Sequence, residues 1–154
     1  MIPSYLGVAC VVHCDDPCGR QPPGPMLREL LPAHATAAGK VLLAFRQPWR
    51  DSVLAKPLRR YTEGTITLAR DFDRAATEIR SRGYAIDDGE YRSETLGIAA
   101  PVFVRGHPPA ALALSILQGH GVAHVDALIE RVVTAAAAVT LALKQPEPGS
   151  DGRP

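Results

Sequence analysis

A long stretch near the carboxyl end of the chain carries apolar residues at every third or fourth position. This repeat predicts an amphipathic helix from about Ala123 to Lys144. Asp126 near its start and Lys144 at its end suit the helix dipole, and Pro146 ends it. The apolar face of such a helix must pack against another element, so the chain must also form a sheet or further helices. The residues expected on the packed face are Val125, Leu128, Ile129, Val132, Val133, Ala136, Val139 and Leu143.

Three shorter helices are predicted over residues 36–45, 49–55 and 68–82. Thr36 is expected to cap the start of the first, because its hydroxyl can accept a bond from a free backbone amide. Gly83 follows the third, where a left-handed residue ends a helix best. The apolar face of the third helix is expected to comprise Leu68, Phe72, Ala75 or Ala76, and Ile79.

Four short apolar segments favour strands. They cover residues 5–13, 84–86, 95–104 and 110–117, and the second runs into an acidic turn at 87–90. The last two strands are joined by residues 105–109 in a hairpin-like arrangement. The expected fold is therefore an α/β (α+β) domain, with a mainly antiparallel sheet and helices packed on it.

Proline and glycine mark the breaks between these elements. Residues 15–25 alternate Pro and Gly so densely that a loop is expected there. Pro48 is expected to close the helix that ends at Phe45, and Pro101 to lie at a bulge or a sheet edge. Residues 145–154 are expected to form a disordered tail.

Charge and length exclude several classes of protein. The 154 residues match one domain, and 17 Lys and Arg against 16 Asp and Glu give a net charge of +1. A surface that neutralises phosphates is normally much more basic, so direct nucleic-acid binding is not expected. The sequence has no apolar run of the roughly 20 residues that span a membrane and no basic leader, so we expect a cytoplasmic protein without membrane partners.

No catalytic or metal-binding set is recognisable. Cys10, Cys14 and Cys18 are odd in number and lack the paired C-x-x-C spacing of zinc sites, so reduced thiols are favoured over a metal site. His120 and His124 lie four residues apart, but no carboxylate accompanies them. Phosphate-binding loops and serine nucleophile elbows are also absent from the sequence. We therefore expect no enzyme activity, no metal and no cofactor.

Four sequence words occur in order at residues 31–44, 61–67, 82–88 and 98–102. They read LPAHATAAGKVLLA, YTEGTIT, RGYAIDD and IAAPV. Together they resemble the effector-binding domain of the IclR family of bacterial transcriptional regulators, over about residues 5–144.

The resemblance implies a GAF-like fold, a curved antiparallel sheet flanked by helices, with a pocket on one face. It also implies a small-molecule effector, often a carboxylate or an aromatic acid, and a homodimer or tetramer. The family carries a winged helix-turn-helix that binds DNA. We expect that module to be absent here, because Met1 precedes the domain by only a few residues. DNA would then be a partner only through a helix-turn-helix that this chain lacks.

The residues at the matching positions suggest a ligand site. Small residues in the first helical turn would expose backbone amides to a carboxylate. Gly97 stands where the family often has cysteine and Ala113 where serine is common, and both changes open space for a larger or more apolar effector. The alternatives are that residues 34–40 form only a capped, closely packed helix and that Asp87 only caps a turn. The predicted ligand-binding residues are Thr36, Ala37, Ala38, Gly39, Asp87, Thr95, Gly97, Ala113 and Ser115.

Three functions follow from these patterns. The leading hypothesis is an effector-sensing domain that modulates DNA binding by an attached helix-turn-helix. A stand-alone GAF-like ligand-binding or oligomerisation module is an alternative. A small enzyme using the same pocket would need a titratable pair in it, and the sequence places only Asp87 there.

Overall fold

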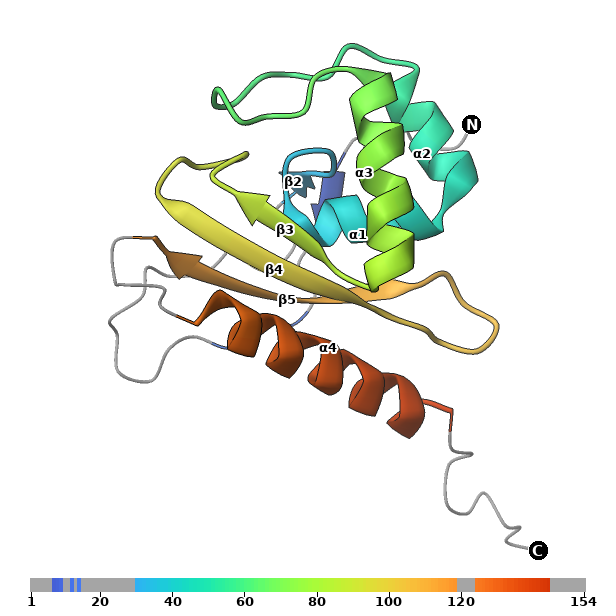
Figure 1. Ribbon diagram of the computed structural model, residues 1–154. Coiled ribbons are helices and arrows are strands. Elements are labelled where there is room, and N and C mark those ends of the chain that lie inside the picture. The colour runs from blue at the N-terminus through green and yellow to red at the C-terminus, as the bar shows by residue number, and fades with distance from the viewer. Residues whose placement is uncertain (1–6, 10–11, 13, 15–29, 119–123, 145–154) are drawn as a thin grey trace, which may run out of the picture.

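The computed structural model describes residues 7–9, 12, 14, 30–118 and 124–144. These residues form a mixed α/β fold with antiparallel sheets, as predicted (Figure 1). In chain order, its elements are β1 (Gly7–Ala9), β2 (Leu30–Pro32), α1 (Ala37–Phe45), α2 (Gln47–Leu54), α3 (Ala69–Arg82), β3 (Ala85–Asp88), β4 (Thr95–Val102), β5 (Ala110–Leu117) and α4 (Val125–Ala142).

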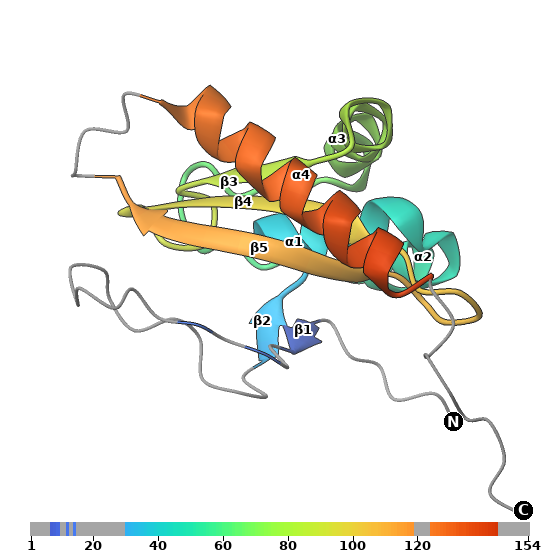
Figure 2. The same cartoon turned by 90° about the horizontal axis from the view of Figure 1, so that it is seen from below.

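The main sheet has three antiparallel strands in the order β3-β4-β5. Helix α4 covers one face of this sheet, and α1 covers the other face with α3 beside it (Figure 1). Figure 2 shows α4 crossing the strands as the outer layer. The short strands β1 and β2 pair with each other, and β1 contacts α1.

Alternation along β4 sorts its residues between the two helical layers. Leu96, Ile98 and Ala100 pack in one core cluster with Val132 of α4. Ala99 points to the opposite face and joins the cluster around α1 and α3. Because side chains of a strand alternate between faces, an almost wholly apolar strand is what a sheet covered on both sides requires. Strand β4 is therefore the centre of the domain.

The predicted helix ends are confirmed at two places. The Thr36 hydroxyl accepts a hydrogen bond from the Gly39 amide at the start of α1. Gly83 follows α3 with φ of 81°, a left-handed conformation that glycine adopts without a steric penalty. Pro48 lies in the first turn of α2 and does not separate α1 from it, contrary to our expectation. Proline is tolerated there because the first amides of a helix have no helical acceptor.

Three residues expected in the core are exposed. Leu68 precedes α3 as its N-cap and is 48% exposed. Val139 of α4 and Leu143, which caps its end, are 40% and 50% exposed, because the α4 residues that pack in the cluster with the sheet run only from Val125 to Ala136. A regular repeat predicts a helical face, but it does not give the length of the surface beneath it.

The predicted strands shift slightly at their ends. Asp87 and Asp88 belong to β3 although a turn was expected there, and β4 ends at Val102. The pairing of β4 with β3 extends to Ala99, so Pro101 lies where β5 is its only paired strand. This agrees with the predicted edge position, because proline has no amide to donate there.

Several predictions fall outside the described residues. They concern the loop at 15–25, the tail at 145–154, Cys10, Cys18 and His120; Cys14 is exposed. Within the described ranges, no helix is both long and apolar enough to cross a membrane. The same ranges contain no cluster of three or more His, Cys, Asp or Glu residues suited to a metal ion.

Candidate functional site

The sheet places three of the predicted residues in one row. Asp87 on β3 pairs with Gly97 on β4, and Gly97 pairs with Ser115 on β5. Directly paired residues share a face, and a β-carbon built on Gly97 would lie 3.4 Å from the β-carbon of Ala37. The row therefore lies on the face of the sheet that α1 covers.

Hydrogen bonds and close packing with neighbouring residues fix the first turn of α1. The Thr36 hydroxyl donates to the Pro32 carbonyl at 2.9 Å and accepts from the Gly39 amide at 3.3 Å. A β-carbon on Gly39 would lie 2.2 Å from the Ala33 carbonyl oxygen, so glycine is needed for this close approach. These contacts give Thr36 and Gly39 structural roles. Among the described residues, no partner for the amides of Ala37 and Ala38 is present.

Asp87 holds a turn with one of its oxygens. Its Oδ1 accepts from the Glu90 amide at 2.7 Å and from the Tyr91 amide at 3.3 Å. Burial raises the pKa of the Asp87 carboxyl above its ordinary value, and these two backbone bonds oppose the rise. The other oxygen, Oδ2, would lie 3.7 Å from a β-carbon on Gly97. The expected turn-capping role is thus present, and Oδ2 lies on the side of Gly97.

The β5 side of the row is more open than the β3 side. Ser115 and Ala113 are exposed, whereas Asp87 and Gly97 are buried. Thr95, another predicted ligand residue, donates its hydroxyl to the Arg92 carbonyl at 2.9 Å. Among the described residues, the row is therefore most accessible at β5.

A buried ion pair beside the row escaped the sequence analysis. Lys40 of α1 and Glu90, which follows β3, are 4% and 9% exposed, and the Lys40 ammonium contacts Glu90 Oε1. Burial raises the pKa of the Glu90 carboxyl, and the charge of Lys40 opposes the rise. Glu90 Oε2 is buried and has no hydrogen-bond partner among the described residues. Lys40 stands within one of the four sequence words, but no sequence pattern indicates that Glu90 contacts it.

Hydroxyl groups from the 61–65 segment hold the backbone of Glu90. Its carbonyl accepts from the Thr65 hydroxyl at 2.6 Å and from the Thr62 hydroxyl at 3.2 Å. Next to them, His34 Nε2 lies 2.9 Å from the Arg59 carbonyl, and its ring packs near that of Tyr61. This network fixes the turn that carries Glu90 against α1.

Comparison with known proteins identifies relatives of this chain. The curated relative "Pca operon regulatory protein" of Acinetobacter baylyi is 37% identical over 87 residues, which are 53% of this chain and 30% of that protein. The chain thus spans about a third of the length of such relatives.

Two solved structures are similar over most of the described fold. An IclR homologue from Microbacterium hydrocarbonoxydans in complex with 4-hydroxybenzoate superposes with a TM-score of 0.69 and 29% identity, covering 77% of this chain and 48% of that one. The inducer-binding domain of PobR from Acinetobacter, a double mutant in complex with 3-hydroxybenzoic acid, gives a TM-score of 0.75 and 26% identity, covering 88% and 82%.

The family model described as "Bacterial transcriptional regulator IclR C-terminal" matches residues 28–141. This range contains α1, α2, α3, the whole β3-β4-β5 sheet and α4 except its last residue. The chain therefore belongs to the IclR C-terminal family of bacterial transcriptional regulators.

Proposed function

We propose that residues 5–144 form the effector-sensing domain of an IclR-type transcriptional regulator, and that the effector is a small carboxylate. DNA would be contacted through a helix-turn-helix in a longer protein, and the domain itself would have no catalytic role. The observation that carries the proposal is the row of Asp87, Gly97 and Ser115 beneath the first turn of α1. Family membership supports it independently.

The carboxylate end of the effector would meet the start of α1. The amides of Ala37 and Ala38 lie in the first helical turn, where partial positive charge favours an anion. Thr36 and Gly39 would support this turn through the cap that joins them. The same geometry disfavours a direct ligand role for the Gly39 amide, because that amide already donates to Thr36.

The other end of the effector would carry a hydroxyl group. A carboxylate at Asp87 repels a bare anion, but its Oδ2 accepts a hydrogen bond from a hydroxyl, and a charged acceptor strengthens that bond. The hydroxyl groups of Ser115 and Thr95 would be the further polar groups of the site. Gly97 and Ala113 would leave room for a ring between the two ends. A hydroxylated aromatic acid would suit this arrangement, and the two similar structures are complexes with 4-hydroxybenzoate and 3-hydroxybenzoic acid.

Calorimetric titration of the chain tests the effector class. We expect 4-hydroxybenzoate to bind more tightly than benzoate by about tenfold, because benzoate leaves Asp87 without its hydrogen bond. Pyruvate and glyoxylate should bind more weakly still. Tightest binding by glyoxylate, the smallest of these acids, would contradict the proposal of a larger effector.

A matched pair of variants locates the site. Ser115→Ala removes the exposed hydroxyl of the row and should weaken 4-hydroxybenzoate binding. Ser93→Ala removes an exposed hydroxyl in the turn before β4, where it lies near Glu94, and should leave binding unchanged. Equal affinities for both variants would place the ligand elsewhere.

Effector binding would act on DNA by a modest coupling. Allosteric coupling of about 1–3 kcal/mol, or 5- to 150-fold in affinity, is typical. In the longer protein, we expect effector to change operator affinity within this range in a gel-shift titration. A longer protein that binds effector but keeps the same operator affinity would refute the regulatory role while leaving the binding site intact.

A further inference from the structure

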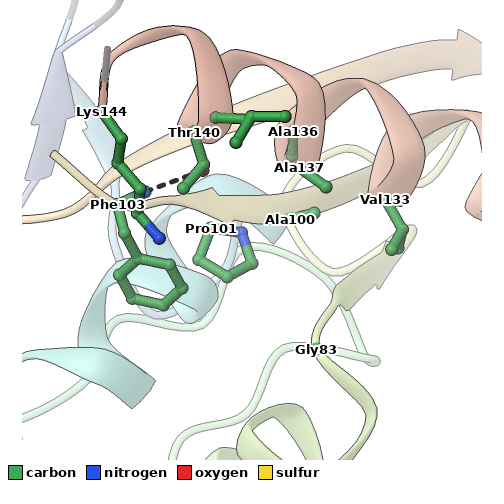
Figure 3. A pocket seen from close by; sticks show the side chains of 10 residues that line it. Gly83, Ala100, Pro101, Phe103, Val133, Ala136, Ala137, Thr140 and Lys144 are labelled. Atoms are coloured by element: carbon green, nitrogen blue, oxygen red, sulfur yellow. Dashed lines mark hydrogen bonds between the residues drawn. The ribbon is translucent and has the colours of Figure 1, made fainter. Parts of the chain in front are cut away.

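An open groove of about 360 Å³, here called the α4 groove, lies beside the second half of α4. Its walls come from α4, from the end of β4 and from the α3–β3 junction at Gly83 (Figure 3). Helix α4 covers the face of the sheet opposite α1 (Figure 1). The groove is therefore separate from the row of Asp87, Gly97 and Ser115. Ligand pockets begin at about 300 Å³, so the groove has room for a small molecule.

Small side chains create this hollow. Ala100 of β4 and Ala136 and Ala137 of α4 all line the groove, and alanine leaves space that a larger side chain would fill. Phe103 and Leu141 add further hydrocarbon to the walls and are 43% and 63% exposed. Covering such a surface removes apolar area from water, which favours a ligand with a hydrocarbon body.

Two polar side chains, Thr140 and Lys144, lie together at one end of the groove beside Phe103 (Figure 3). The Thr140 hydroxyl accepts a hydrogen bond from the Phe103 amide at 3.1 Å. Within the described part of the chain, this hydroxyl has no acceptor for its own proton, so it can donate to a ligand. Of the described residues that line the groove, Lys144 alone is charged.

The position of Lys144 indicates the charge of the ligand. Among the described residues, no carboxylate lies within ion-pair distance of its ammonium. Helix α4 ends at Ala142, and the carboxyl end of a helix repels an anion unless a cation offsets the repulsion. An acid bound here would therefore depend on Lys144. An ammonium and a hydroxyl proton at one end of a hydrocarbon groove complement a carboxylate that carries an apolar chain.

We propose that the α4 groove binds an apolar monocarboxylic acid. The carboxylate accepts hydrogen bonds from Lys144 and Thr140, and the hydrocarbon chain lies along Ala136 and Ala137. This ligand differs from the hydroxylated acid proposed for the α1 face, because the groove contains no carboxylate to accept a hydrogen bond from a ligand hydroxyl. The proposal does not rest on the proposed function.

Calorimetry of the full chain with octanoate as the probe tests the ligand class. Each fully buried methylene contributes about fourfold to affinity. An open groove buries only part of the chain, so octanoate should bind more tightly than butyrate by at least about tenfold. Octylamine has the same hydrocarbon chain but a positive charge, which Lys144 repels, and should bind more weakly than octanoate. Failure of octanoate to bind, or equal binding of octanoate and octylamine, would overturn the proposal.

Two alanines of α4 locate the site. Ala137 lines the groove, whereas Ala135 is also exposed but lies outside it. Ala137→Leu should weaken octanoate binding by about tenfold or more, because the larger side chain occupies the groove. Ala135→Leu should bind octanoate as the unchanged chain does. Circular dichroism should show equal helix content in both variants, and equal octanoate affinities would contradict the proposed location.

The same two variants separate this proposal from the proposed function. Both should keep the affinity of the unchanged chain for 4-hydroxybenzoate, because that acid is assigned to the other face of the sheet. Loss of 4-hydroxybenzoate binding in Ala137→Leu alone would mean that the two acids share one site, and would overturn the proposal. A chain that binds octanoate in the groove but does not bind 4-hydroxybenzoate would support the groove and contradict the effector class.

A second matched pair tests the role of the charge. Lys144→Gln should weaken octanoate binding by about fivefold at low salt, and Lys144→Arg should retain most of the affinity. Arg131→Gln changes the net charge equally at an exposed position of α4 outside the groove, and should leave binding unchanged. Equal effects of Lys144→Gln and Arg131→Gln would show that only the net charge matters and would refute a carboxylate contact at Lys144.

Discussion

Ala37 and Gly97 touch across the two layers of the domain. A β-carbon on Gly97 would lie 3.4 Å from the β-carbon of Ala37 and 3.3 Å from that of Asp87. The first turn of α1 therefore rests directly on the central strand, beside the carboxyl group that caps the turn after β3.

Enlarging Gly97 should disturb the packing of α1 on β4. Gly97→Val places a branched side chain against Ala37 and Asp87, and we expect it to lower the free energy of unfolding by about 1–3 kcal/mol and to abolish effector binding. Ala113→Val, on the same face but exposed, should change stability by no more than about 0.5 kcal/mol. Urea denaturation and calorimetry measure the two effects. A Gly97→Val protein of normal stability and affinity would contradict the close packing of Gly97 against Ala37 and Asp87.

Gly39 should tolerate no side chain. Gly39→Ala would bring a β-carbon to 2.2 Å from the Ala33 carbonyl oxygen, so the helix start or the preceding turn must move. We expect a loss of at least about 3 kcal/mol in urea denaturation. Gly64→Ala is the control, because its nearest neighbour would be 3.7 Å away. Similar stability of the two variants would contradict the packing of Ala33 on α1.

The ion pair of Lys40 and Glu90 should show strong coupling. Lys40→Met leaves the Glu90 carboxylate buried without its cation, and we expect a loss of about 3–5 kcal/mol. Adding Glu90→Gln should recover part of this loss, because the remaining amide carries no charge. A double-mutant cycle by denaturation measures the coupling. Additive effects of the two substitutions would mean that the pair does not interact in solution.

Stability should depend on pH through Asp87. Burial raises the pKa of this carboxyl and of Glu90 in the folded protein above their ordinary values of 3.8 and 4.5. The folded state thus holds these protons more tightly, and the resulting stability is present below the ordinary values and is lost as the pH rises through the raised ones. Asp87→Asn keeps an oxygen for the Glu90 amide but has no proton to lose.

We therefore expect Asp87→Asn to gain stability relative to the unchanged chain as the pH rises from about 4 to about 7. Thermal or urea unfolding at several pH values gives the difference. A difference between the two proteins that stays constant with pH would show that Asp87 does not titrate differently in the folded and unfolded states.

Local signals explain which predictions were confirmed. The Thr36 cap, the Gly83 helix end and the buried Phe72 and Ile79 of α3 each depend on residues within a few positions of one another. Sequence patterns report such short-range effects directly. The motif words also predicted the family, because their order along the chain reflects a shared fold.

Other features had no local signal. Leu68, Val139 and Leu143 continue apolar repeats, yet each lies outside the buried face of its helix. Nothing near Lys40 in the sequence indicates that Glu90 will meet it, since the contact joins α1 to the turn after β3.

By itself, the sequence determined the four helices, every described strand except β2 (Leu30–Pro32), the antiparallel α/β class and the family to which the chain belongs. Only the tertiary structure decided that Asp87, Gly97 and Ser115 lie in one row under α1, that Lys40 and Glu90 are buried together, and that the second half of α4 remains uncovered. The physical reason is the separation along the chain over which each effect acts. Periodicity, capping and turn formation act between neighbours in the chain, whereas strand register and burial depend on segments that meet only when the chain has folded.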